Sequence, residues 1–95
     1  MYGNFIGKVI DCVSSHSGKS KDGRDYETRE YLFEVSGMRP YRFVFRLFRW
    51  VEPGVENQWP LVGERADVRC ECTASCTKDG KWFNQVNCSD YKKMA

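Results

Sequence analysis

The chain carries almost no excess charge: 15 Lys and Arg residues stand against 13 Asp and Glu residues, for a formal net charge of +2. A protein that binds a polyanion through charge alone is expected to carry a larger basic excess. The small excess lies in residues 1–49, which hold nine basic and six acidic residues. Charge alone therefore does not predict a nucleic-acid ligand, and any basic binding surface is expected to draw mainly on the first half.

Long hydrophobic runs are also missing. No apolar stretch approaches the length that crosses a bilayer, and residues 1–4 lead directly into an expected strand instead of a signal peptide. We therefore expect a cytoplasmic protein with no membrane partner. The chain has five cysteines. Their odd number and the reducing cytoplasm both favour reduced thiols over a disulfide framework.

The residues of a catalytic site are lacking as well. The single histidine, His16, lies in a serine-rich segment with no second ligand at metal-binding spacing. There is no nucleophile–base pair and no pair of catalytic carboxylates, and Gly18-Lys19-Ser20 lacks the upstream glycine and the following helix of a phosphate-binding loop. We expect a protein that is not an enzyme and that needs no cofactor.

Four cysteines in the C-terminal third raise the possibility of a zinc site, because four thiolates can hold this ion. They are Cys70, Cys72, Cys76 and Cys88. Zinc knuckles use a tight Cys-x2-Cys turn, whereas Cys70 and Cys72 fall on one face of an expected strand with no turn between them. With residues 78–80 as a hairpin loop, Cys70 faces Cys88 and Cys72 faces Val86. We predict small core residues and no metal.

The chain does contain enough apolar (41%) and aromatic (15%) residues for one packed core. Apolar runs and turn residues predict an all-β domain over residues 1–90, followed by a short tail at 91–95. The expected strands lie at residues 3–13, 26–35, 40–48, 64–74 and 81–89. Residues 14–25 are expected to form a polar loop, and residues 50–63 at most one or two helical turns, between Val55 and Trp59. Gly7 would let the first strand bend strongly enough to join two sheets.

Alternation assigns a buried and an exposed face to two strands. In the third strand we expect a core face of Tyr41, Phe43, Phe45 and Leu47 and an outer face of Arg42, Val44, Arg46 and Phe48. In the fourth strand we expect Ala66, Val68, Cys70, Cys72 and Ala74 to point inward.

Short motifs along nearly the whole chain resemble those of small bacterial and phage proteins related to single-stranded DNA-binding proteins. They are Gly7-Lys8-Val9-Ile10, residues 17–23, Leu61-Val62-Gly63-Glu64 and Gly80-Lys81-Trp82-Phe83-Asn84. The resemblance implies a five-stranded Greek-key barrel of the oligonucleotide/oligosaccharide-binding (OB) fold. It also implies single-stranded DNA as the ligand and assembly into a homodimer or homotetramer.

A binding groove on such a fold needs cations for phosphates and exposed rings for bases. The candidate cations are Lys19, Lys21 and Arg24 on the first loop, Arg42, Arg46 and Arg49 on the third strand, and Lys78 and Lys81 at the last hairpin. The candidate rings are Tyr26, Phe48 and Phe83, with Trp82 expected in the core unless a bulge at Gly80 exchanges the two neighbours.

A structural alternative competes for two of the arginines. If Val35 faces Tyr41, Glu34 lies opposite Arg42 and Glu30 opposite Arg46, and such cross-strand pairs would neutralise both cations. The leading hypothesis is sequence-nonspecific binding of single-stranded DNA. The alternative is an OB-fold module for protein interaction or oligomerisation, and RNA or an oligosaccharide remains as a further ligand class.

Overall fold

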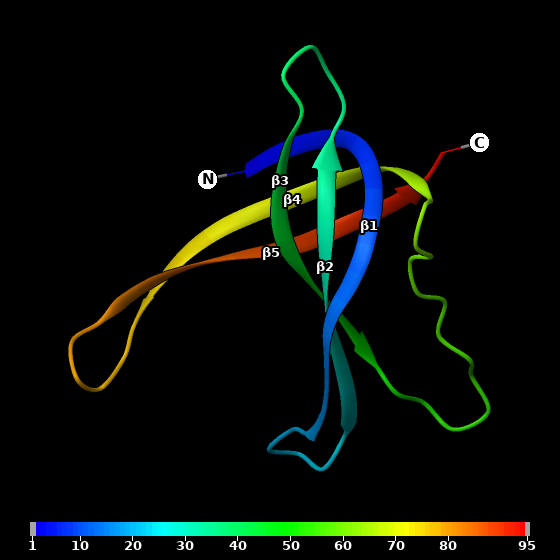
Figure 1. The fold of residues 1–95 in the computed structure, drawn as a ribbon. Helices are drawn as coiled ribbons and strands as arrows, with labels where there is room; N and C mark the ends of the chain where they lie inside the picture. The colour runs from blue at the N-terminus through cyan, green and yellow to red at the C-terminus, as the bar shows by residue number, and fades with distance from the viewer. Residues whose placement is uncertain (1, 95) are drawn as a thin grey trace.

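The computed structural model describes residues 2–94, which form one sheet of five strands and no helix (Figure 1). The strands are β1 (Tyr2–Lys19), β2 (Asp25–Val35), β3 (Tyr41–Trp50), β4 (Arg65–Cys76) and β5 (Trp82–Lys93). The sheet closes on itself in the order β1-β2-β3-β5-β4, and every pairing is antiparallel except β3 with β5. Within these residues, no helix has the length and hydropathy that crossing a bilayer would need.

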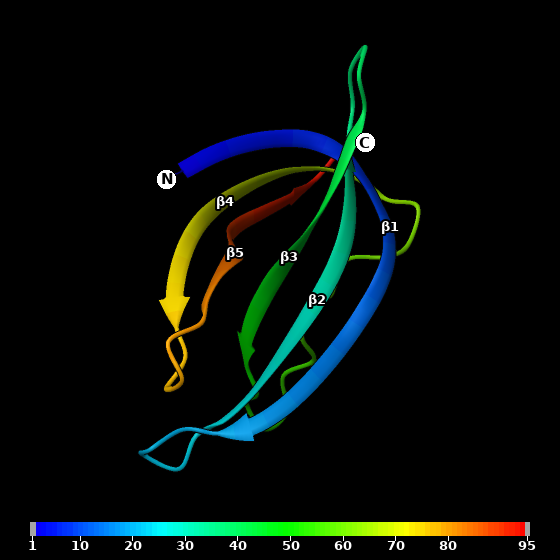
Figure 2. The same ribbon diagram turned by 60° about the vertical axis from the view of Figure 1, so that its left-hand side comes forward.

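A bend in β1 closes the sheet. β1 pairs with β4 through residues 2–8 and with β2 through residues 7–19, so Gly7 belongs to both ladders. A Cβ atom at Gly7 would lie 2.1 Å from the carbonyl oxygen of Glu34, a distance that no side chain tolerates. Glycine thus allows β1 to curve over its neighbours, as both views show (Figures 1 and 2). The expected strong bend is confirmed, but β1 pairs on both sides of it within one closed sheet and does not join two separate sheets.

The core lies inside the closed sheet. Its buried residues are Val9, Tyr31, Phe33, Phe45, Leu47, Ala66, Val68, Cys70 and Cys88. The rings of Phe33 and Phe45 lie 5.7 Å apart between centroids, edge to face. The predicted core face of β3 is confirmed at Phe45 and Leu47, and Phe43 is half-buried against them. The core prediction is wrong for Tyr41, which is 52% exposed because it lies at the open end of the sheet beside a cavity.

Two strands are longer than the sequence predicts. β1 continues to Lys19, which reduces the predicted loop at residues 14–25 to residues 20–24. β5 continues to Lys93, so residues 91–93 of the expected tail pair with β4, and the Tyr91 ring packs on the core. In residues 14–19 both faces are polar, and the backbone pairing to β2 holds the strand without a buried side.

The far ends of β4 and β5, residues 71–87, form a hairpin that we call the arm, and it projects away from the closed sheet (Figure 1). Ala66, Val68 and Cys70 are buried as expected, but Cys72 and Ala74 are exposed. The alternation of faces continues along β4, whereas the core ends at Cys70. The inward prediction is therefore wrong for these two residues, because the arm extends beyond the apolar interior.

Candidate nucleic-acid interface

The outer face of β2 and β3 has the register in which Val35 faces Tyr41. Glu34 lies opposite Arg42 and Glu30 opposite Arg46, with Leu32 and Val44 between them. Only one of the two charge pairs forms. Arg42 Nη2 lies 3.2 Å from Glu34 Oε2, whereas Arg46 makes no ion pair within residues 2–94. Arg46 is therefore the strand cation whose charge stays available.

Three rings gather at one end of this face. Tyr26 stacks on Phe48 with centroids 5.4 Å apart, and Trp50 meets Phe48 edge to face at 4.9 Å. Phe48 is 43% and Trp50 38% exposed, so this aromatic cluster presents ring surface to solvent. The sequence predicts that Trp50 lies in the connection after the third strand, whereas it is the last residue of β3. The signal that would have found it is the alternation Arg46, Phe48, Trp50, which continues two residues beyond the predicted end.

Two depressions extend from this cluster toward the arm. One, of about 390 Å³, is lined by Tyr26, Thr28, Arg46, Phe48, Asn87 and Cys88. The other, of about 290 Å³, is lined by Glu30, Val44, Arg46, Phe83, Asn84, Gln85 and Val86. They adjoin at Arg46, and we call them together the outer groove. β3 and β5 are bridged only between Arg46 and Asn87, which leaves the space on both sides of this contact open.

Phe83 closes the end of the outer groove opposite the aromatic cluster. It is 48% exposed, in agreement with its predicted outward position. Trp82 is 72% exposed, so its predicted core position is wrong. Trp82 has the inward parity of Cys88, but it pairs with Cys76 near the tip of the arm, where no core remains to cover it.

The β1–β2 and β4–β5 hairpins end in two turns of similar sequence and geometry. In both views the tips of these hairpins lie at the opposite end of the molecule from the β2–β3 turn (Figures 1 and 2). Residues 20–24 read Ser-Lys-Asp-Gly-Arg and residues 77–81 read Thr-Lys-Asp-Gly-Lys. Gly23 and Gly80 have φ of 84° and 85°, in the left-handed region that favours glycine. In each turn the first hydroxyl donates to the Asp side chain and accepts from the backbone N–H four residues later.

The predicted cations on these tips divide into paired and unpaired residues. Lys19 Nζ lies 3.2 Å from Asp25 Oδ1. Arg24 lies 3.8 Å from Glu52 Oε1, and its guanidinium carbon lies 4.1 Å from the centroid of the Trp50 ring. The lysines at positions 21, 78 and 81 make no ion pair within residues 2–94. Arg24 thus packs against the aromatic cluster, while the three lysines remain free to meet phosphates.

Arg49 is a candidate cation that lies away from the outer groove. It has the parity of the inner face of β3, and its guanidinium carbon lies 5.9 Å from the centroid of the Trp59 ring. Arg29 lies over the same ring at 4.3 Å. Trp59 packs in turn against the core, so these arginines cover its ring and do not face the outer groove.

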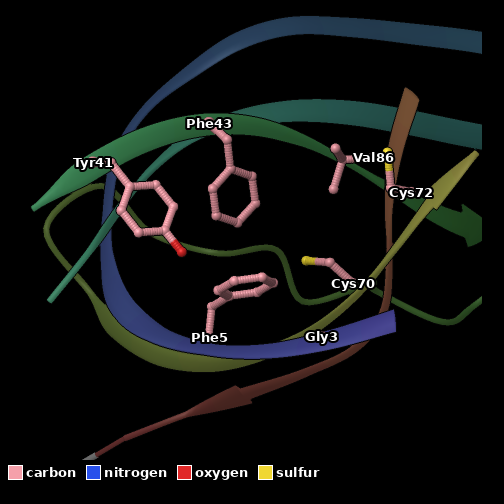
Figure 3. A pocket seen from close by; sticks show the side chains of 7 residues that line it. All are labelled: Gly3, Phe5, Tyr41, Phe43, Cys70, Cys72 and Val86. Atoms are coloured by element: carbon pink, nitrogen blue, oxygen red, sulfur yellow. The ribbon is translucent and has the colours of Figure 1, made fainter. Parts of the chain in front are cut away.

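A separate cavity of about 250 Å³ opens at the other end of the core (Figure 3). Its lining residues are Gly3, Phe5, Tyr41, Phe43, Cys70, Cys72 and Val86. The three rings and the Cys70 sulfur point into this end cavity. Cys70 pairs with Cys88 and Cys72 with Val86, as the hairpin register predicts. Within residues 2–94, no three His, Cys, Asp or Glu side chains converge as a metal site would require.

No protein-family model matches the chain, and no curated protein matches it. The resemblance to single-stranded DNA-binding proteins therefore stays a prediction that rests on the short motifs. The function is therefore inferred from the outer groove, its exposed rings and the cations that make no ion pair within residues 2–94.

Proposed function

We propose that the protein has an OB fold and binds single-stranded DNA along the outer groove without strong sequence preference. The observation that carries the proposal is Arg46, a cation without an ion partner in residues 2–94, at the junction of two depressions that end in exposed rings. A five-stranded closed sheet with a bent first strand supports the OB fold.

The chemistry of the groove suits a single strand. Exposed rings at Phe48 and Phe83 offer stacking surfaces, and stacking accepts every base because each base has a π-face. Arg46 and the lysines of the two tips supply positive charge for the phosphates. The groove thus combines sequence-tolerant stacking with backbone neutralisation, which favours binding without sequence preference.

The alternative is an OB-fold module for protein interaction or self-association. The Arg42–Glu34 pair favours it, because a paired arginine on the outer face is partly neutralised. The near balance of charge points the same way. An interaction module would self-associate or bind a protein partner and leave DNA unbound, and the expected homodimer or homotetramer is compatible with both functions.

The test is fluorescence anisotropy of a labelled oligo-dT strand at low salt, combined with sedimentation of the same protein sample. We expect saturable binding at micromolar protein or below, and competition by unlabelled oligo-dT that exceeds competition by oligo-U or a neutral oligosaccharide. Self-association without any rise in anisotropy at micromolar protein would replace DNA binding with the alternative function. Preferential competition by RNA or sugar would change the ligand class.

A matched pair of variants tests the location. Phe83 and Trp82 are neighbours, but successive residues of a strand point to opposite faces, and only Phe83 lines the groove. Phe83→Ala should weaken oligo-dT binding by about 1–3 kcal/mol, the usual contribution of one stacked base. Trp82→Ala should leave the affinity unchanged. Equal losses, or a larger loss for Trp82→Ala, would move the site to the other face of the arm.

A further inference from the structure

Cys70 and Cys88 lie directly opposite each other on β4 and β5 at the base of the arm. They are 3% and 9% exposed, whereas the other cysteines, at positions 12, 72 and 76, are exposed. All five are free thiols in the structure. The buried pair is thus separated from the rest by both its register and its surroundings.

The register also fixes the type of pair. Thr77 N–H donates to the Lys81 carbonyl oxygen at 2.8 Å, so these two residues form a hydrogen-bonded pair at the end of the hairpin. Hydrogen-bonded and non-hydrogen-bonded pairs alternate along an antiparallel ladder. Cys70 and Cys88 lie seven positions further on, with no register shift between, and are a non-hydrogen-bonded pair. Cα atoms in such pairs lie about 4.5 Å apart, within the range of about 4.4–6.8 Å that a disulfide spans.

The two thiols differ in reactivity and in access. The hydrogen bond from the Cys70 thiol to Cys88 lowers the pKa of Cys88 against the opposing effect of burial, and the charge of Arg49 acts in the same direction. The same hydrogen bond, together with burial, raises the pKa of Cys70. Cys88 lines the larger depression of the outer groove, while Cys70 borders the end cavity (Figure 3). Cys88 is also the more exposed of the two, at 9% against 3% for Cys70, so a reagent that reaches the pair from the outer groove meets Cys88 first.

We propose that Cys70 and Cys88 form a redox-active dithiol that a low-molecular-weight disulfide, such as glutathione disulfide, oxidises to a cross-strand disulfide. The Cys88 thiolate attacks one sulfur of the reagent, whose S–S bond breaks and releases one thiolate. Cys70 then loses its proton to water and attacks the Cys88 sulfur of the mixed disulfide, which releases the second reagent thiol. Two protein thiols are oxidised to one disulfide, and the reagent disulfide is reduced to two thiols.

The disulfide would link β4 covalently to β5 at Cys88, which lines the outer groove. It would covalently fix the base of the arm beside Arg46 and Phe48, which line the same depression as Cys88. The oxidation depends only on the geometry of the two thiols and stands independently of DNA binding.

The test uses a variant in which Cys12, Cys72 and Cys76 are all replaced by Ser, so that only the proposed pair remains. After incubation of the folded protein with glutathione disulfide, denaturation and alkylation, mass spectrometry should find two thiols lost and no glutathione retained. Trypsin cuts the chain between these two cysteines, so residues 70–78 and 82–92 become separate peptides. A disulfide should hold the two peptides together. Two thiols still alkylated, or glutathione retained without a cross-link, would overturn the proposal.

Single-thiol controls in this background test the order of attack. With Cys70→Ala added, the mixed disulfide should accumulate at Cys88 because no resolving thiol remains. With Cys88→Ala added, Cys70 should stay unmodified over the same time. Circular dichroism establishes that each variant is folded. If the triple variant does not fold, wild-type protein cleaved by trypsin and also after Glu71, which separates Cys70 from Cys72 and Cys76, decides the linkage. The 70–88 linkage supports the pair, and linkages that involve only the exposed cysteines, or that join one of them to Cys88, refute it.

Discussion

At the scale of single residues, two arginines on the same face of β3 have different surroundings. Arg42 pairs with Glu34 at 3.2 Å, and Arg46, in the outer groove, has no ion partner in residues 2–94. A surface pair contributes little to stability but does occupy its cation. The two residues therefore form a matched comparison, because their chemistry is the same and their availability to a phosphate differs.

Arg46→Gln should weaken the binding of oligo-dT and of other single-stranded sequences by a similar factor. The slope of log affinity against log salt should become shallower by ~0.7, the value for one phosphate contact. Arg42→Gln should change both quantities much less, because Glu34 already offsets the Arg42 charge. Anisotropy titrations at several salt concentrations measure both effects. An equal loss of slope in the two variants would show that the ion pair opens when DNA binds.

Tyr91 should make stability depend on pH in the alkaline range. Burial raises the pKa of Tyr91, and its hydrogen bond to the Glu64 carboxylate raises it further. The unfolded chain loses this proton near pH ~10 while the folded protein keeps it, so the free energy of unfolding falls as the pH rises above that value. The slope is at most about 1.4 kcal/mol per pH unit for each such tyrosine.

Urea unfolding between about pH 8 and pH 11 measures this slope, and Tyr91→Phe provides the comparison. The variant should fall less steeply than the wild type, with a residual slope from Tyr31, whose pKa burial also raises. Parallel curves for variant and wild type would assign the alkaline dependence to other groups.

At the scale of elements, the bend of β1 decides whether the sheet closes. A Cβ at Gly7 would approach the Glu34 carbonyl oxygen to 2.1 Å and the Phe33 ring to 2.8 Å, so Gly7→Ala forces the β1–β2 ladder apart. We expect a loss of about 3 kcal/mol in the free energy of unfolding. Gly63→Ala is the control, because a Cβ there meets open space and only the φ of 89° is unfavourable, at about 1–2 kcal/mol. A loss at Gly7 no larger than at Gly63, measured by urea unfolding, would contradict the role of the bend.

The accuracy of the sequence predictions follows the location of the core. Alternation identified Phe45, Leu47 and Val68 because one side of these strands is dry. It failed for Cys72, which continues the same pattern after the core has ended, and for the all-polar residues 14–19, which have no buried face to produce a pattern. Alternation reports burial, whereas strand length depends on backbone pairing that extends past the apolar interior.

The candidate site likewise contains contacts that the sequence predicts and contacts that it does not predict. The hairpin register that predicts Glu34 opposite Arg42 and Cys70 opposite Cys88 is local, because a short turn fixes it, and the structure confirms both pairs. The contact of Arg24 with Glu52 is not local. It depends on the chain after β3 returning to the first hairpin, where Val51 N–H donates to the Asp25 carbonyl oxygen at 2.9 Å. Such a contact leaves no periodic signal in the sequence.

At the scale of the whole molecule, the positions of the unpaired cations describe the charge that meets a ligand better than the net charge of +2 does. Ion pairs such as Lys19–Asp25 and Lys93–Glu64 each remove one cation and one carboxylate and leave the net charge unchanged. Among residues 2–94, the candidate cations that make no ion pair are Lys21, Arg46, Lys78 and Lys81. These four lie on the groove and on the two hairpin tips, so a strand that follows the groove would displace counterions from the phosphates they contact.

The number of these contacts sets the salt dependence of binding. At about −0.7 per contact for a single strand, four contacts give a slope of log affinity against log salt of about −3. Replacing the three lysines by Gln should reduce the slope to about −0.7, leaving Arg46 as the remaining contact. Oligo-dT titrations at several salt concentrations measure both slopes. A wild-type slope of only about −0.7 would exclude the tips from DNA contact, and a slope near zero would exclude Arg46 as well. One well steeper than −3 would show that paired Lys19 and Arg24 also release their carboxylates to the strand.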